Sequence, residues 1–170
     1  VERDGLGGSA VLTDCVPSKT LIATAELMTE VRGSAELGVR LSGDGSGDGG
    51  AGPVVDLGAV NSRVKELAAS QSADIARQLS NAGVRVIAGL GRLDGPERVV
   101  VGDETLAADA ILIATGAHPR ILPTAVPDGE RILTWEQVYE LPELPERLVV
   151  VGSGVTGAEF ASAYNALGVD

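Results

Sequence analysis

The chain has 170 residues, which is enough for one ordinary domain with a sizeable core. Its 24 acidic and 13 basic side chains give a net charge of −11, which argues against the basic surface that nucleic acids and anionic membranes require. A single cysteine cannot form a disulfide framework and no apolar run reaches membrane-spanning length, so we expect a cytoplasmic protein, and we predict no metal site.

The first four residues read as the tail of a strand followed by a charged turn. On the residues alone, Glu2 is best interpreted as a surface glutamate in that turn. The alternative follows from its position, because a carboxylate after the second strand of a dinucleotide-binding fold holds ribose hydroxyls.

A double glycine, Gly7 and Gly8, precedes the only cysteine, Cys15. Without a Cβ, the glycine backbone can lie against a flat or phosphorylated ligand. The pattern predicts a helix over residues 18–31 that Gly33 ends, so that Cys15 stands at its N-terminus with Lys19 four residues on. Both features favour the thiolate, whereas the alternative interpretation is a buried structural cysteine.

The middle of the chain predicts an insert and a second helix. Residues 43–53 are rich in glycine and aspartate, which indicates a flexible, solvated insert, and the aspartates argue against a phosphate-binding role. Asp56 is a plausible N-cap for a long helix that ends at Gly83. The predicted buried stripe of this helix consists of Val60, Val64, Leu67, Ile75 and Leu79.

After Gly83 the apolar pattern changes to that of strands. Residues 84–89 predict a strand, and residues 93–104 predict a hairpin. The all-apolar run 110–114 predicts a central parallel strand covered on both faces, which ends at Thr115 and Gly116.

The last part of the chain carries a glycine fingerprint. A short helix is predicted over 135–139, prolines at 142 and 145 indicate a boundary, and 148–151 predict a strand. Gly152, Gly154 and Gly157 then open a helix, as the phosphate-binding turn of a dinucleotide site does. We favour dinucleotide binding over a cluster of glycines that serves packing alone.

The segment from Gly7 to Lys19 resembles the redox-active segment of the flavoprotein disulfide reductases, the family of dihydrolipoamide dehydrogenase and glutathione reductase. The family pattern is Gly-Gly-Thr-Cys-Leu-Asn-Val-Gly-Cys-Ile-Pro-Ser-Lys. The positions that match it in register are Gly7, Gly8, Cys15, Pro17, Ser18 and Lys19. The first family cysteine falls on Ala10, so no disulfide can form within this chain.

The resemblance implies a set of cofactor-binding and catalytic residues. Glu2 would hold the ribose of FAD, and Gly7, Gly8, Gly89, Ala114, Thr115 and Gly116 would lie against FAD. Gly152, Gly154 and Gly157 would bind NAD(P)H. Glu159 would pair with Lys19 beside the flavin, the alternative being a solvent-exposed helix glutamate. His118 is interpreted as a loop residue, because the family's catalytic histidine lies in a later segment.

The resemblance also implies the fold class, an α/β, doubly wound, three-layer Rossmann-like FAD/NAD(P)-binding fold with a small antiparallel β insert. We expect residues 1–143 to belong to the FAD-binding domain and 144–170 to begin the NAD(P)-binding domain. The chain is then a fragment that lacks the first strand and glycine turn, and the full-length protein is a homodimer.

The function that these features imply is transfer of hydride from NAD(P)H to FAD and on to a quinone or similar small acceptor, with Cys15, Lys19 and Glu159 as catalytic residues. The sequence looks most like the family members that lack the disulfide and reduce quinones. Two alternatives stay open. One is a dihydrolipoamide dehydrogenase-like disulfide reductase that uses a cysteine from another segment. The other is a non-catalytic flavoprotein that senses NAD(P)H.

Overall fold

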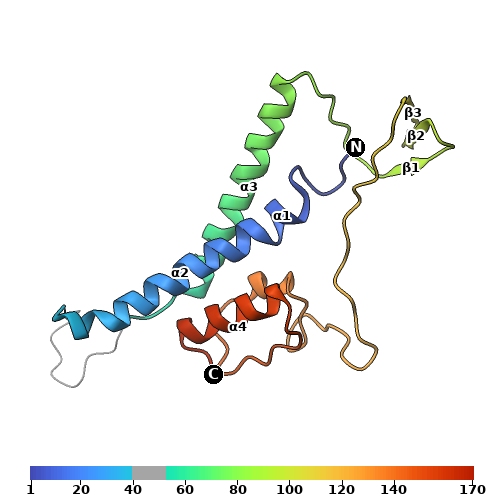
Figure 1. Cartoon of the computed structure of the whole chain (residues 1–170). Coiled ribbons are helices and arrows are strands. Elements are labelled where there is room, and N and C mark those ends of the chain that lie inside the picture. Colours follow the sequence, from blue (N-terminus) through green and yellow to red (C-terminus); the bar gives the residue numbers. More distant parts are fainter. Residues whose placement is uncertain (40–52) are drawn as a thin grey trace.

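The computed structural model of the chain describes residues 1–39 and 53–170 (Figure 1). Its helices are α1 (Gly8–Leu12), α2 (Cys15–Gly33), α3 (Leu57–Asn81) and α4 (Val155–Leu167), with 3₁₀ helices η1 (Ser34–Leu37) and η2 (Gln137–Glu140). Its strands are β1 (Gly91–Leu93), β2 (Arg98–Val101) and β3 (Glu104–Ala107). The insert predicted over 43–53 lies outside the described residues except for Pro53.

Helix α2 begins at Cys15, three residues before the predicted start, and ends at Gly33 as predicted. Pro17 fits in the first turn because the N–H groups there have no partner within the helix. Leu21, Ala25 and Met28 follow one another at spacings of four and three and are buried. This apolar face packs against both α3 and α4.

Helix α3 has the predicted N-cap, since the Asp56 carboxylate accepts a hydrogen bond from the Ala59 N–H at 2.9 Å. Its buried residues are Leu57, Asn61, Val64 and Ala68. Val64 was predicted correctly, but Leu67 is 41% exposed and its predicted burial is wrong. Leu67 is exposed because the buried face of α3 is formed by positions 57, 61, 64 and 68, and Leu67 lies next to that face.

The core lies where α2, α3, α4 and η2 meet. Its aromatic part comes from η2 and α4, with ring centroids 5.6 Å apart for Tyr139 and Phe160 and 6.4 Å apart for Phe160 and Tyr164. The short helix predicted over 135–139 is present as η2, displaced toward the C-terminus. Because η2 contributes Val138 and Tyr139 to the core, it fixes the chain that leads into α4.

Helices α2 and α4 run parallel to each other. Lys19 near the start of α2 pairs with Glu159 near the start of α4, and Arg32 near the end of α2 donates a hydrogen bond to the Ala166 carbonyl near the end of α4 at 2.5 Å. Figure 1 shows the same alignment, with both helices running in the same direction from their N-terminal ends. Two segments far apart in the sequence are therefore joined along their whole length.

The three strands form a small antiparallel sheet in the order β1-β2-β3. Val101 pairs with Glu104, so β2 and β3 are joined by the two-residue turn of Gly102 and Asp103. Gly102 has φ +58°, which glycine adopts without steric cost. The predicted hairpin and the small antiparallel insert are confirmed.

The parallel sheet predicted for this chain is not seen in the described residues. Segments 84–89, 110–114 and 148–151 form no strands there, and the single parallel contact is a bridge between Glu2 and Ala88. A strand requires a neighbouring backbone for its N–H and C=O groups, and no hydrogen bond to the backbone of 110–114 is found among the described residues. Leu112 is 89% exposed and Ile113 65%, so the burial predicted for this run is wrong in this structure.

No helix within 1–39 and 53–170 combines the length and the apolar character needed to cross a bilayer.

Candidate functional site

Cys15 is the first residue of α2 and is exposed. The predicted position at a helix N-terminus is confirmed, and the alternative of a buried structural cysteine is wrong. Cys15, Lys19 and Arg63 line an open hollow of about 500 Å³ together with Val16, Thr20 and Ala23. The thiol therefore faces solvent beside two cationic side chains.

Lys19 and Glu159 form an ion pair between α2 and α4. The Lys19 side chain is 61% exposed and that of Glu159 22%, so the carboxylate is the more shielded partner. The hydrogen bond from Lys19 holds the pKa of Glu159 below its usual value and raises the pKa of Lys19. Both groups are therefore charged across the neutral range. The contact expected from the family resemblance is present, and a freely solvated Glu159 is ruled out.

The double glycine is where α1 begins. Gly7 is the N-cap of α1 with φ +98°, and a Cβ added there would overlap the Val11 side chain. Gly8 has φ +58°, and a Cβ added there would meet no atom within 4 Å. The space beside Gly8 is thus open, and the close approach of a ligand there stays a prediction.

The glycine fingerprint forms the turn that opens α4. Gly152 has φ +132° and Gly154 is the N-cap. A Cβ at Gly157 would overlap the carbonyl oxygen of Gly152, so only glycine lets the first turn of α4 close onto this turn. A Cβ at Gly154 would meet nothing, which leaves its backbone free for a phosphate. The geometry gives Gly157 a packing role, and the dinucleotide role of these glycines stays a prediction.

The Glu2 carboxylate is turned back onto its own backbone. Its Oε1 accepts hydrogen bonds from the N–H groups of Arg3, Asp4 and Gly5 at 2.8, 2.9 and 3.3 Å. These bonds, that from Asp4 first, lower the pKa of Glu2. Its backbone bonds to residues 87 and 89, at 3.0 Å from the Glu2 N–H to the Ile87 carbonyl and 2.9 Å from the Gly89 N–H to the Glu2 carbonyl. The carboxylate therefore orders its own turn, and a role at a ribose stays a prediction.

Gly89 has φ +147°, and a Cβ there would lie 2.8 Å from the Val101 side chain. Packing against β2 is thus enough to require a glycine at this position. Its predicted contact with a cofactor is not tested by this geometry.

Ala114, Thr115 and Gly116 are exposed and lie in a segment without regular secondary structure. In Figure 1 this segment runs from the small sheet past the N-terminal region, away from the paired helices α2 and α4. Within the part of the chain that the structure describes, no hydrogen bond or ion pair joins these three residues to Lys19 or Glu159. His118 is exposed in the same segment, as predicted for a loop histidine.

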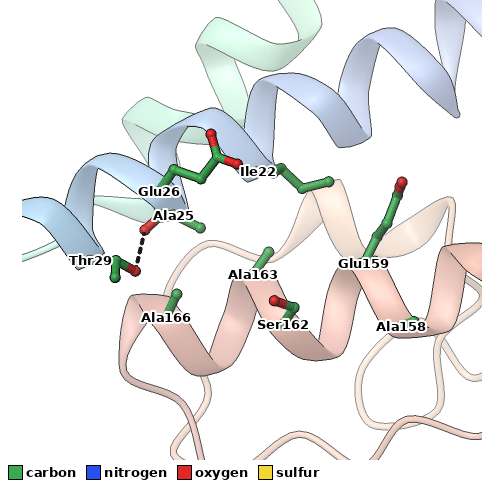
Figure 2. Close-up of a pocket in the computed structure, with 9 residues that line it drawn as sticks. All are labelled: Ile22, Ala25, Glu26, Thr29, Ala158, Glu159, Ser162, Ala163 and Ala166. Atoms are coloured by element: carbon green, nitrogen blue, oxygen red, sulfur yellow. Dashed lines mark hydrogen bonds between the residues drawn. The ribbon is translucent and has the colours of Figure 1, made fainter.

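A groove between α2 and α4 was not predicted from the sequence. Its volume is about 340 Å³, and Figure 2 shows Ala158 and Glu159 toward one end of it and Ala166 at the other. Its lining residues are Ile22, Ala25, Glu26, Thr29, Ala158, Glu159, Ser162, Ala163 and Ala166. Small residues spaced four apart at 158, 162 and 166 were the signal that could have indicated a close helix contact on this face of α4.

The comparisons with known proteins agree with this geometry. The family model for pyridine nucleotide-disulphide oxidoreductases matches residues 1–170. The chain belongs to this family. A member of this family therefore carries the features described above, namely the glycine turns, the exposed Cys15 and the Lys19–Glu159 pair.

Similar individual proteins come from two branches of this family. The chain is 50% identical over 180 residues to an NAD(P)H dehydrogenase (quinone) of Mycobacterium tuberculosis, a match that covers 99% of the chain and 35% of that relative. It is 34% identical over 175 residues to a dihydrolipoyl dehydrogenase of Zymomonas mobilis, covering 100% of the chain and 36% of that relative.

A crystal structure of LpdA from Mycobacterium tuberculosis superposes with a TM-score of 0.84 at 49% identity, covering 99% of the chain and 37% of that structure. The chain thus spans roughly a third of the length of these oxidoreductases.

Proposed function

We propose that the protein containing this chain is an FAD-dependent NAD(P)H oxidoreductase that passes electrons to a quinone or similar small acceptor without a redox-active disulfide. The observation that carries the proposal is the Lys19–Glu159 ion pair, which joins the helix that begins at Cys15 to the helix that the glycine fingerprint opens. The 50% identity to an NAD(P)H dehydrogenase (quinone) supports the same activity.

The chain's own residues fit the two cofactors. Gly8 offers an open backbone, and Gly152 and Gly157 form a turn that any Cβ at position 157 would block. In the proposed enzyme, the first turn of α4 donates its free N–H groups to the pyrophosphate of NAD(P)H. Glu159 holds the Lys19 ammonium in place, so that one positive charge stands at a fixed position beside the flavin. FAD, when bound, would accept hydride from the nicotinamide and pass the electrons on.

The rest of the fold is part of the proposal. In the whole protein, segments 84–89, 110–114 and 148–151 are strands of a doubly wound parallel sheet, residues 1–143 belong to the FAD-binding domain and residues 144–170 begin the NAD(P)-binding domain. The apolar and exposed side chains of Leu112, Ile113, Val149 and Val151 support this, because such runs are typical of strands covered on both faces. The whole protein is proposed to act in the cytoplasm as a homodimer.

Ala10 decides the choice of acceptor. A thiol–disulfide relay needs an attacking thiol and a resolving one, and this chain has only Cys15. Electrons therefore leave the proposed enzyme from the flavin, and quinones are suitable two-electron acceptors.

A dihydrolipoamide dehydrogenase-like activity is the second candidate. The exposed thiol of Cys15 and the 34% identity to a dihydrolipoyl dehydrogenase favour it. It requires a second cysteine from outside this chain that reaches Cys15. The third candidate is a non-catalytic NAD(P)H sensor. It would bind the nucleotide but would reduce neither a quinone nor a disulfide such as lipoamide.

The deciding experiment measures turnover by the full-length protein with NAD(P)H and either a quinone or lipoamide. We expect a purified yellow protein with rapid quinone reduction, negligible lipoamide reduction and no additional titratable thiol after NAD(P)H is added. The matched variant is Cys15→Ser. In the proposed enzyme electrons leave from the flavin, so the catalytic role that the family resemblance implies for the Cys15 thiol is used only by a disulfide reductase, and C15S should keep most of the quinone activity. Brisk lipoamide turnover that C15S abolishes would establish the disulfide reductase instead, and NAD(P)H binding without any turnover would establish the sensor.

A further inference from the structure

Ser18 differs from the other hydroxyl residues of α2 in its hydrogen bonding. Thr20, Thr24 and Thr29 each donate to the carbonyl four residues earlier, at 2.8, 3.2 and 3.1 Å. This is the usual bond of a hydroxyl inside a helix. Ser18 makes no such bond to the Asp14 carbonyl, although that carbonyl stands at the same spacing. Within the described residues, the Ser18 hydroxyl is therefore the one hydroxyl of α2 that makes no bond to the backbone of its own helix.

The Ser18 hydroxyl is deeply buried. The residue is 3% exposed, and within the described residues its Oγ has no hydrogen-bond partner at ordinary distance. A buried hydroxyl without a partner is costly, so such groups almost always find one. Ser18 stands four and seven residues before Ile22 and Ala25, which line the groove between α2 and α4, so the three residues share one face of α2. Its neighbour Lys19 reaches Glu159 on α4.

The Glu159 carboxylate lines the same groove as Ile22 and Ala25, so it is an ionised acceptor on the α4 side of the helix face that carries Ser18. Ser18 adds to the lowering of the Glu159 pKa, after the larger contribution of Lys19. Lys19 is bonded to Oε1 of this carboxylate. A carboxylate has acceptor positions for several donors, so one from Ser18 can be added to that of Lys19.

We propose that the Ser18 hydroxyl donates a hydrogen bond to the Glu159 carboxylate and is a positioning residue for the Lys19–Glu159 pair. The buried Ser18 hydroxyl then holds the carboxylate from the core, and the more exposed Lys19 ammonium holds it from the solvent side. A carboxylate held by two donors keeps one orientation, and so does the ammonium that it holds. The inference rests on the proposed function only for the role of this pair in the enzyme.

Other groups also act on Glu159 and must be held constant in a test. From α2 these are Lys19 and, along the same groove, Glu26; from η2 the buried Tyr139 hydroxyl lies within range of the carboxylate charge. Asp14, before α2, also acts on Tyr139. The test therefore changes Ser18 alone and follows the protonation of Glu159 directly.

The test is a pH titration of the full-length protein carrying ¹³C-labelled glutamate carboxyl groups. The Glu159 resonance is assigned by its loss in Glu159→Gln. We expect Ser18→Ala to move its titration midpoint to higher pH, because the ionised form loses a donor, with a proton affinity increased about threefold to tenfold. Ser162→Ala is the matched control, because this exposed hydroxyl lines the same groove on α4 and should leave the midpoint unchanged.

Thermal unfolding gives a second, independent readout. If Ser18 bonds to Glu159, S18A lowers the melting temperature; if the hydroxyl has no partner, its removal raises it. An unchanged Glu159 midpoint, or a raised melting temperature, would overturn the proposal. Should S18A shift the midpoint as expected while Glu159→Gln leaves flavin reduction by NAD(P)H at the wild-type rate, the positioning role stands and the proposed function of the pair fails.

Discussion

Gly157 is the residue whose side chain the fold excludes most directly, because a Cβ there would overlap the Gly152 carbonyl. We predict that Gly157→Ala displaces the first turn of α4 and weakens NAD(P)H binding by about tenfold or more, since the pyrophosphate contacts depend on that turn. The measurement is a titration of the full-length protein with NADH and NADPH. Amide exchange in α4 should increase as well.

Two other glycines serve as controls for this variant. Gly33 ends α2 with open space beside it and an ordinary φ, so Gly33→Ala should leave nucleotide binding unchanged. Gly154→Ala also meets no atom of the protein, so it should weaken nucleotide binding without the increased exchange in α4. Wild-type affinity in G157A would show that the turn tolerates the displacement.

Asp128 organises a loop through its charge. Its Oδ1 accepts hydrogen bonds from the N–H groups of Glu130, Arg131 and Ile132 at 2.9, 2.8 and 2.9 Å. These donors, that of Ile132 first, lower the pKa of Asp128 to about 2. Because the pKa is lower in the folded state than its unfolded value of about 3.9, the loop is stabilised above about pH 4 and loses this stabilisation as the pH falls toward 2.

We therefore predict that protection of amides 130–132 from hydrogen exchange, relative to the unfolded chain, declines between about pH 4 and pH 2 in the wild type. Asp128→Asn should show low protection at both pH values, because the neutral amide binds the three donors less strongly. Asp103→Asn, in the turn between β2 and β3, is the control and should behave as the wild type. Equal protection in D128N and wild type at neutral pH would contradict this account.

Single residues differ in how far the sequence could predict them. The Lys19–Glu159 contact was expected from the family resemblance, although the two residues are 140 positions apart. The turn of the Glu2 carboxylate onto its own N–H groups was not, because glutamate has no positional signature for that conformation. The motif gives the position of Ser18 but does not predict that its hydroxyl is buried, since that burial depends on how α2 packs against its neighbours.

Arg32 joins the C-terminal ends of two helices. It stands in the last turn of α2 and donates to the Ala166 carbonyl in the last turn of α4, where a cation is favourable for both helix ends. We predict that Arg32→Ala destabilises the protein by about 0.5–1 kcal/mol. The check is urea unfolding of the full-length protein, together with amide exchange at the end of α4.

Arg77→Ala is the matched control, because Arg77 is an exposed arginine of α3 that pairs with Asp74 of the same helix. Surface pairs of this kind contribute about 0.5 kcal/mol or less. Equal effects of R32A and R77A, with unchanged exchange at the end of α4, would show that the Arg32 contact contributes nothing specific.

The helices and the hairpin could be predicted because their signals are local. Asp56 caps α3 from three residues away, and Gly102 turns the chain between adjacent strands. The parallel strands could not be recovered in this structure, since a strand forms only beside a partner. In the described ranges the one parallel contact is the bridge between Glu2 and Ala88.

The composition of the chain and its motifs predict different properties of the molecule. The net charge of −11 excludes classes of partner but does not point to a fold. The family was predicted from the thirteen residues from Gly7 to Lys19 and from the glycine fingerprint, and the match over residues 1–170 confirms it. The groove between α2 and α4 could not be predicted, because it depends on two helices that are distant in sequence and on their parallel direction.

The parallel pairing of α2 and α4 also has a mechanical consequence. Lys19 and Arg32 attach α4 at two points separated by roughly 20 Å along α2, given the rise of an α-helix. One point of attachment would allow a pivot, whereas two so far apart resist rotation about any axis across the helices. Helix α4 is thus held against α2 near both ends, so the two helices form one lever. Any opening that admits a nucleotide must bend the chain elsewhere.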